Sequence, residues 1–283
     1  MQQITILQAL SQARGDIGDT DARLLLQTVL NVNHAHLIAH SDQELVPAEA
    51  QYLHQLIARR AQGEPVAYLM GKREFYGLSF KVTPAVLIPR PETELLVDLA
   101  LERMPLDHSS KILDLGTGSG AIAISIANHR PLANITAVDA SADAVAVAKI
   151  NARQLNVNNI RIIEGDWFGG LAGKRFDLIV SNPPYIAGSD PHLAQGDLRF
   201  EPQTALTTGG DSLDCIRCII ASAAAHLVAG GTLLLEHGYD QAEACRQLLD
   251  KAGFCEVFSR PDLAGIMRAS GGVWEFPRET ARI

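Results

Sequence analysis

The sequence predicts an α/β protein in which a small N-terminal helical domain precedes a mostly parallel, doubly wound sheet. Strand-like and helix-like segments alternate from residue 112 onward, which is typical of parallel strands joined by helices on both faces. The strand-like segments are short and apolar throughout, as strands buried on both faces are. Residues 1–71, in contrast, show only the helical spacing of apolar residues.

The N-terminal domain, residues 1–71, is predicted to be a bundle of helices. Its apolar residues recur at helical spacing in successive runs. Asp19 and Thr20 come just before one run and are expected to cap that helix, and Pro47 suits the first turn of another. Residues 72–91 change character and are predicted to form a short hairpin or extended connector.

The remaining domain, residues 92–283, is predicted to carry the sheet. A helix is expected over residues 92–104. The strands are expected at residues 112–115, 135–138, 160–163, 176–180, 232–235 and 254–258. The further helices are expected at residues 121–128, 142–155, 211–228 and 241–251. Residues 186–210 have little periodicity and are predicted to be a long loop, which in a compact domain is usually functional.

Composition argues against a nucleic-acid or membrane partner. The chain carries a formal net charge of −8 and lacks the basic surplus of proteins that follow phosphate backbones. It has no run of roughly eighteen apolar residues that would span a membrane, and its start does not resemble a signal peptide. Cys215 and Cys218 have CxxC spacing, but no second such pair accompanies them as at a zinc site. We expect a cytoplasmic protein without a bound metal.

The sequence Asn-Pro-Pro-Tyr at residues 182–185 follows a predicted buried strand. Neither proline has an N–H for the strand ladder, so the chain must turn outward there. The side-chain oxygen of Asn182 and the carbonyl of Pro183 can each accept one N–H of a planar NH₂ group, and the ring of Tyr185 can stack on that group. The pattern predicts a site for a planar nitrogen, with a plain turn carrying a half-buried Tyr185 as the alternative.

A glycine-rich turn follows the first strand of the alternation. It consists of Gly116, Thr117, Gly118, Ser119 and Gly120. Glycines allow a tight turn and a close approach of ligand to backbone, but the pattern also fits dinucleotide sites. Asp139 ends the next strand and can accept both hydroxyls of a ribose, which NAD and S-adenosylmethionine share. Trp167 follows the third strand and is expected near the adenine, or else as a core aromatic.

The two motifs are expected to meet. Both lie at the carboxyl ends of strands, where open α/β sheets bind ligands. If the strand at 176–180 lies beside the strand at 112–115, Asn182 approaches the glycine turn. Hydride transfer has no evident need for Asn-Pro-Pro-Tyr at that place, whereas a methyl donor facing a planar nitrogen does.

With these motifs in place, the chain resembles the class I methyltransferases that modify planar amino or amide nitrogens, and most closely the release factor glutamine methyltransferases. The resemblance covers nearly the full length. It rests on residues 22–26, 63–69, 73–77, 87–94, 114–120, 180–186 and 199–202. The segment Leu-Ile-Pro-Arg-Pro-Glu-Thr-Glu at residues 87–94 makes it more specific than either motif alone.

The resemblance implies a Rossmann-like methyltransferase that acts on the glutamine of the Gly-Gly-Gln loop in peptide chain release factors. It implies S-adenosylmethionine as donor and S-adenosylhomocysteine as product. The donor contacts carry over to Gly116, Thr117, Gly118, Ser119, Gly120, Asp139, Trp167 and Asn182. Asn182, Pro183 and Tyr185 carry over as catalytic residues, and with Pro184 they bind the substrate glutamine.

The resemblance further implies that the helical domain holds the release factor, and we expect a monomer without direct nucleic-acid contact. Three alternatives stay open: methylation of exocyclic amino groups of nucleic-acid bases, a non-catalytic nucleoside-binding module, and an NAD-dependent oxidoreductase.

Several residues outside these motifs have open roles. Arg90 and Glu92 are expected to organise the substrate mouth or to form a structural ion pair, and Glu201 to shape the loop after residue 185. Glu236 and His237 end a strand and are expected mostly outside the cleft. Residues 268–272, Arg-Ala-Ser-Gly-Gly, depart from the family pattern and put the last hairpin of the sheet in doubt.

Overall fold

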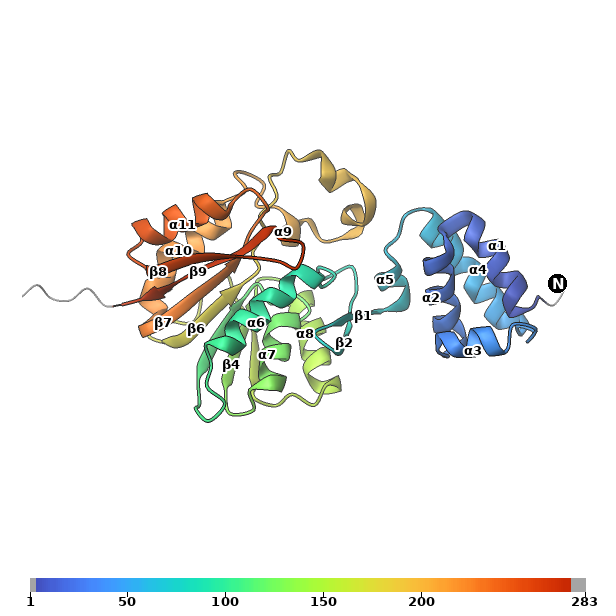
Figure 1. The fold of residues 1–283 in the computed structure, drawn as a ribbon, viewed down its shortest axis with the longest axis horizontal. Coiled ribbons are helices and arrows are strands. Elements are labelled where there is room, and N and C mark those ends of the chain that lie inside the picture. The colour runs from blue at the N-terminus through green and yellow to red at the C-terminus, as the bar shows by residue number, and fades with distance from the viewer. Residues whose placement is uncertain (1–3, 276–283) are drawn as a thin grey trace, which may run out of the picture. The chain divides into compact units, whose positions relative to one another are not determined.

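The computed structural model describes residues 4–275, which form two compact units (Figure 1). The helical unit comprises the chain up to Arg73 together with Ala194–Phe200. The α/β unit comprises Glu74–Leu193 and the chain from Glu201 onward. The chain therefore leaves the α/β unit after Leu193, joins the helical unit for one short segment, and returns at Glu201.

The helical unit packs its helices around an aliphatic core. Its helices are α1 (Ile6–Ile17), α2 (Asp19–Leu30), α3 (His34–Ala39), α4 (Pro47–Ala61) and α5 (Val66–Met70). Leu25 and Leu26 of α2 and Leu53 and Leu56 of α4 are buried in one cluster. Pro47 occupies the first turn of α4, as predicted.

The predicted caps Asp19 and Thr20 were wrong. A single residue, Gly18, separates α1 from α2, and Asp19 is already the first residue of α2. No side chain caps this helix start. Asp19 instead pairs with Arg14 of α1 at 2.5 Å and with Arg23 of α2 at 2.9 Å, which suits a carboxylate near the positive end of a helix dipole.

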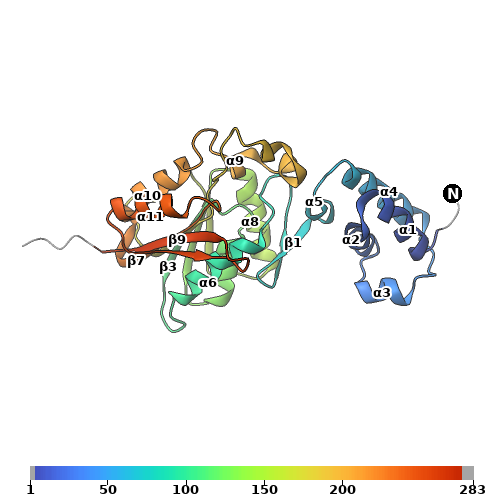
Figure 2. The same ribbon diagram turned by 45° about the horizontal axis from the view of Figure 1, so that its top comes forward.

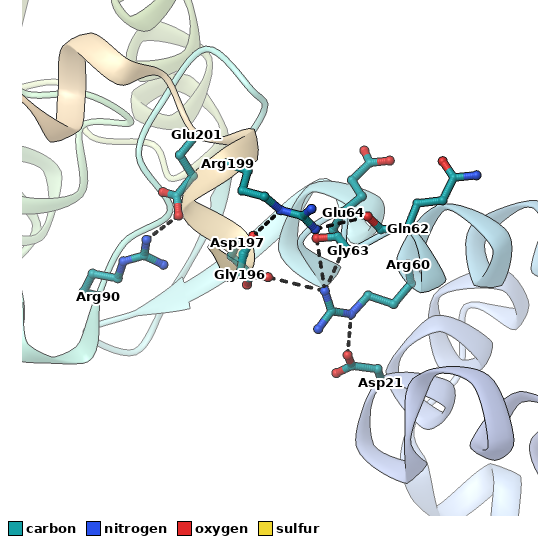
Figure 3. Close-up of polar contacts among 10 residues, drawn as sticks. All are labelled: Asp21, Arg60, Gln62, Gly63, Glu64, Arg90, Gly196, Asp197, Arg199 and Glu201. Atoms are coloured by element: carbon teal, nitrogen blue, oxygen red, sulfur yellow. Dashed lines mark hydrogen bonds and ion pairs between the residues drawn. The ribbon is translucent and has the colours of Figure 1, made fainter. Parts of the chain in front are cut away.

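Arg60, near the end of α4, binds the segment Ala194–Phe200 within the helical unit (Figure 3). Its guanidinium donates to Asp21 of α2 at 2.6 Å and to the carbonyl of Glu64 at 3.1 Å. It also reaches Asp197 at 3.3 Å, and Arg199 donates to the carbonyl of Gln62 at 3.2 Å. The predicted loop 186–210 is thus partly ordered on the helical unit.

Residues 186–210 contain short helices, contrary to the expectation of a plain loop. They are η2 (Pro191–Ala194), η3 (Gly196–Phe200) and α9 (Gln203–Leu206). Single helical turns with proline and glycine at their ends do not produce a readable apolar period, which explains why the sequence pattern missed them.

The connector forms a hairpin before the main sheet begins. The strands β1 (Lys72–Phe75) and β2 (Leu78–Lys81) pair with each other. They are followed by η1 (Pro91–Thr93) and α6 (Glu94–Glu102), where a helix was predicted.

The α/β unit is a seven-stranded sheet with helices on both faces (Figures 1 and 2). Its strands are β3 (Lys111–Leu115), β4 (Asn134–Asp139), β5 (Ile160–Glu164), β6 (Phe176–Ser181), β7 (Leu227–Glu236), β8 (Cys255–Pro261) and β9 (Met267–Trp274). The order is β5-β4-β3-β6-β7-β9-β8. The strands from β5 to β7 are parallel, and β9 pairs antiparallel with β7 and β8. The predicted mostly parallel, doubly wound sheet is confirmed.

Each face of the sheet has its own apolar core, because successive strand residues point to opposite faces. Ile112 of β3 belongs to the cluster that α6, α7 (Ala121–His129) and α8 (Ala142–Gln154) cover. Leu113 belongs to the cluster that α10 (Asp214–His226) and α11 (Ala242–Lys251) cover. The order of strands reverses between β3 and β6, so their carboxyl ends flank the switch point where such sheets bind ligands.

The last hairpin, placed in doubt by residues 268–272, is present as β8 and β9. Close packing explains why residues 271 and 272 are glycines. A Cβ on Gly271 would lie 2.5 Å from the carbonyl oxygen of Leu233, and one on Gly272 would lie 3.0 Å from the Cβ of Phe254. The departure from the family pattern is therefore accommodated by close packing of β9 between its neighbours.

Candidate functional site

A cavity of about 540 Å³ opens at the carboxyl ends of β3, β4 and β6 in the α/β unit. This volume is within the range of small-molecule sites. Of the predicted site residues, those that line it are Gly116, Thr117, Gly118, Ser119, Asp139, Trp167, Asn182 and Pro184. The connector contributes Arg90, η1 contributes Thr93, and the segment after Glu201 contributes Pro202 and Thr204. Gly120, Pro183 and Tyr185 are not among the lining residues.

The glycine turn is tied to the neighbouring strand by its backbone. The N–H groups of Gly116 and Thr117 both donate to the carbonyl of Val138, at 2.9 and 3.0 Å. A Cβ on Gly118 would meet open space, so the cavity can bring a ligand close to the backbone there. Gly120 has a packing role, since a Cβ would lie 2.7 Å from the Cδ1 of Ile124.

The carboxylate of Asp139 is held by two backbone N–H groups. One carboxylate oxygen accepts the N–H of Gly118 at 2.8 Å, and the other accepts the N–H of Ser141 at 2.9 Å. Each oxygen of an ionised carboxylate has a further lone pair. Asp139 can therefore accept two ribose hydroxyls without giving up its backbone contacts, which fits a nucleoside ligand.

Asp114 lies beneath the glycine turn and was not singled out from the sequence. It is fully buried, and burial raises its pKa to about 7 despite a hydrogen bond from the hydroxyl of Thr117. Thr117 donates to it at 2.6 Å. The hydrogen bond from Thr117 to Asp114 therefore stabilises the glycine turn.

Asn182 follows β6 directly and faces the cavity. The preceding residue, Ser181, donates its hydroxyl to the carbonyl of Leu115 at 2.7 Å, which fixes the end of β6 to the end of β3. The amide nitrogen of Asn182 donates to the hydroxyl oxygen of Thr93 at 3.1 Å. Among residues 4–275 no hydrogen bond occupies the amide oxygen of Asn182, so it is available as an acceptor.

β6 does lie beside β3, as the sequence argument required. The carbonyl oxygen of Asn182 lies 4.0 Å from where a Cβ on Gly116 would be. The glycine turn and the Asn-Pro-Pro-Tyr segment are therefore brought together at one edge of the sheet.

Tyr185, the last residue of the Asn-Pro-Pro-Tyr segment, does not line the cavity. Its ring packs, partly buried, against the apolar cluster under α10 and α11. Its hydroxyl donates to Glu236 at 3.1 Å, and its carbonyl accepts from the side chain of Gln241, also at 3.1 Å. Burial and the charge of Glu236 raise the pKa of Tyr185, so the phenol stays protonated and donates to Glu236.

Glu236 is a buried carboxyl at the end of β7. Burial raises its pKa to about 7, against the opposing effect of the Thr93 and Tyr185 hydroxyls. Its oxygen Oε2 is buried and has no partner of ordinary hydrogen-bond geometry among the described residues. Neither Glu236 nor His237 lines the cavity, in agreement with the expectation that they lie outside it. His237 bonds to Ser270 of β9 at 2.8 Å.

Arg90 forms an ion pair with Glu201 (Figure 3). The carboxylate of Glu201 is fully buried and also accepts the backbone N–H of Ile88 at 3.0 Å. Arg90 lines the cavity, so this pair fixes the connector to the segment that begins at Glu201. The structural ion pair is therefore present, formed with Glu201, while a role of Arg90 in organising the substrate mouth stays a prediction.

No group of three or more His, Cys, Asp or Glu side chains within residues 4–275 is arranged to hold a metal ion. Cys215 lines the cavity, but burial raises the pKa of its thiol to about 11. The described residues also include no helix that is long and apolar enough to cross a bilayer.

Two models of known protein families match this chain, one in its N-terminal part and one in the part that follows. The family model of the PrmC N-terminal domain matches residues 5–71, and the Methyltransferase small domain model matches residues 92–213. The chain is 56% identical over 259 residues to the release factor glutamine methyltransferase of Burkholderia pseudomallei, covering 89% of this chain and 90% of that one. This chain belongs to the release factor glutamine methyltransferase family.

Other members of the family are similarly close. The chain is 46% identical over 266 residues to the Salmonella typhimurium protein of the same name, covering 94% of this chain and 96% of that one. The Escherichia coli protein is 49% identical over 237 residues, covering 84% and 85%. The predicted family is therefore confirmed.

Solved structures of low sequence identity share the fold. A methyltransferase from Pyrococcus furiosus superposes with a TM-score of 0.55 at 20% identity, covering 77% of this chain and 98% of that one. The 16S rRNA N2 G1207 methyltransferase of T. thermophilus, solved with AdoMet and guanosine, gives 0.53 at 21% identity, covering 71% and 49%. These likenesses support the Rossmann-like methyltransferase fold.

Proposed function

We propose that this chain transfers a methyl group from S-adenosylmethionine to the side-chain amide nitrogen of the glutamine in the Gly-Gly-Gln loop of peptide chain release factors. One observation supports this beyond family membership. Asn182 lines a nucleoside-sized cavity with its backbone carbonyl next to the glycine turn, and its amide oxygen takes part in no hydrogen bond among the described residues.

The donor site consists of the glycine turn, Asp139 and Trp167. The backbone of residues 116–119 offers close approach, Asp139 accepts the ribose hydroxyls, and Trp167 lies against the adenine. S-adenosylmethionine, when bound, supplies an electrophilic methyl carbon on a sulfonium and leaves as S-adenosylhomocysteine. The residues that line the cavity fit such a ligand, since a carboxylate with spare lone pairs and an aromatic ring flank an open backbone turn.

The substrate site consists of residues 182–185. The oxygen of the Asn182 side chain and the carbonyl of Pro183 each accept one N–H of the glutamine amide. Pro184 and Tyr185 shape the platform, with Tyr185 anchored to Glu236. An amide nitrogen is a weak nucleophile, because its lone pair is shared with the carbonyl.

Chemistry on such a nitrogen needs orientation and electrostatic help. Positioning alone supplies about 7–11 kcal/mol in favourable cases. Acceptors on both N–H groups stabilise the positive charge that grows on nitrogen as the N–C bond forms, so their effect is concentrated in the transition state. The surplus proton leaves to water.

The helical unit is proposed to hold the release factor, and the enzyme to act as a monomer in the cytoplasm without direct nucleic-acid contact. Mass spectrometry tests the activity. A release factor incubated with this protein and donor should gain one methyl group on the Gly-Gly-Gln glutamine. Methylation of RNA or DNA but not of the release factor would contradict the proposal.

Replacing Asn182 by Ala tests the site. We expect turnover to fall by about 10²–10³-fold, as on loss of one transition-state hydrogen-bond partner, while calorimetry shows donor affinity within a few-fold of wild type. Asn158→Ala, an exposed asparagine of the same unit, is the matched control. Unchanged turnover in Asn182→Ala would refute the role of Asn182.

A further inference from the structure

The orientation of the Asn182 amide decides whether it can accept from a substrate. An amide presents an acceptor on one side and a donor on the other. Turned by 180°, Asn182 would present its NH₂ to the NH₂ of the glutamine and repel it. The proposed site therefore requires something that distinguishes the two orientations.

The only hydrogen bond that the Asn182 side chain makes among the described residues is to Thr93, at 3.1 Å. A threonine hydroxyl can accept or donate. By itself this contact would suit either orientation of the amide. The choice depends on where the hydroxyl proton of Thr93 goes.

The carboxylate of Glu236 is a candidate acceptor for the hydroxyl proton of Thr93. Tyr185 donates to its Oε1 at 3.1 Å, while Oε2 is buried without a partner of ordinary geometry. The Thr93 hydroxyl lies near enough to lower the pKa of Glu236, and like Glu236 it is buried. When Glu236 is ionised its oxygens can only accept, so a neighbouring hydroxyl that turns towards Oε2 donates its proton.

A Thr93 hydroxyl that donates to Glu236 can only accept from Asn182. We propose that Thr93 is a positioning residue: held by Glu236, it accepts one N–H of Asn182 and keeps the amide oxygen turned towards the substrate nitrogen. This rests on the role proposed above for Asn182.

The surroundings of the three groups support a fixed arrangement. Thr93 and Glu236 are 5% and 2% exposed, so water competes little for these hydrogen bonds. They come from separate elements, η1 and β7. The charged groups that act on Glu236 are Arg268 of β9, which favours its ionised form, and Glu92 of η1, which opposes it.

The test compares Thr93→Val with Thr93→Ser at pH 8.5, above the pKa of Glu236. Valine keeps the shape of threonine without the hydroxyl, and serine keeps the hydroxyl. With release factor as substrate we expect Thr93→Val to lower kcat about 10-fold or more. The KM for release factor and the affinity for donor should stay within about 2-fold, and Thr93→Ser should recover most of kcat.

A second readout does not depend on activity. In protein labelled with ¹⁵N-asparagine, the Asn182 side-chain signals are assigned by their loss in Asn182→Asp. Wild type and Thr93→Ser should each show one Asn182 amide proton protected from exchange with water, and Thr93→Val should lose that protection.

The outcomes separate the two proposals. If the protection depends on the Thr93 hydroxyl but wild type does not methylate release factor, the positioning role stands and the proposed substrate fails. If Thr93→Val keeps the protected proton, or loses no more kcat than Thr93→Ser, the positioning role is refuted. Circular dichroism of each variant establishes that it is folded.

Discussion

At the residue scale, Gly271 shows how a backbone contact can require one residue type. It lies in β9, the central strand of the antiparallel part of the sheet, between Leu234 of β7 and Phe258 of β8. A Cβ there would approach a carbonyl oxygen to 2.5 Å, a distance at which the backbone itself must move. The glycine therefore follows from close packing and needs no functional explanation.

Gly271→Ala is expected to destabilise the α/β unit by about 1–3 kcal/mol, the usual cost of overpacking a core. Denaturant unfolding followed by tryptophan fluorescence measures this, because Trp167 and Trp274 both belong to that unit. Gly15→Ala is the control, since nothing lies within 4 Å of a Cβ at that position in α1. Circular dichroism should show that variant at least as stable as wild type, and equal stability of Gly271→Ala and wild type would contradict the packing argument.

At the scale of elements, the segment Ala194–Phe200 is the clearest case of a piece of chain whose neighbours in space differ from its neighbours in sequence. It follows the Asn-Pro-Pro-Tyr platform by about ten residues, yet it belongs to the helical unit. Arg60 and Arg199 hold it there through Asp197 and the carbonyl of Gln62 (Figure 3). The loop after the platform is thus anchored in the unit proposed to hold the protein substrate.

Arg60→Met is expected to release this segment, because its guanidinium joins Asp21, Asp197 and the carbonyls after α4. A charged hydrogen bond of this kind stabilises by about 1.5 kcal/mol, so amide exchange over residues 194–200 should accelerate roughly 10-fold. Hydrogen exchange with mass spectrometry measures it.

Arg59→Met is the matched control for that experiment. Among the described residues Arg59 forms an ion pair only with Glu64, at 2.5 Å, and its side chain is half exposed. Exposed ion pairs contribute little to stability. Exchange that is equally fast in the two variants, or unchanged in Arg60→Met, would show that the segment does not depend on Arg60.

At the scale of the whole molecule, two buried carboxyls couple folding to pH. The pKa values of Asp114 and Glu236 are both raised to about 7 by burial. In the unfolded chain each loses its proton near pH 4, whereas the folded protein keeps both until about pH 7. The folded state therefore binds more protons over this window, and stability falls as pH rises through it.

Glu236→Gln removes the contribution of one of these two carboxyls to the pH dependence of stability. From pH 5 to pH 7 the free energy of unfolding of wild type should fall by about 2 kcal/mol relative to the variant, at about 1.4 kcal/mol per pH unit of pKa difference. Urea unfolding at the two pH values measures this difference.

Glu243→Gln should not reproduce that trend, because hydrogen bonds from Gln247 and Arg246 lower the pKa of this exposed carboxyl. A wild-type-minus-Glu236→Gln difference that is the same at pH 5 and pH 7 would contradict the burial argument.

The sequence by itself determined the class of sheet, the glycine turn and the Asn-Pro-Pro-Tyr platform. Each of these is a local pattern. A strand buried on both faces is apolar along its length, a tight turn needs glycine, and two prolines end a strand wherever they occur. The family followed from these motifs together with residues 87–94.

Only the tertiary structure decided which distant side chains meet. Thr93 and Asn182 are 89 residues apart, Tyr185 and Glu236 are 51 apart, and Arg60 and Asp197 are 137 apart. Such contacts depend on the order of strands and on how side chains pack behind them, and neither leaves a periodic trace along the chain. For the same reason the sequence predicted only that the ring of Tyr185 stacks on a planar group. In the fold the hydroxyl of Tyr185 donates to the buried carboxyl of Glu236.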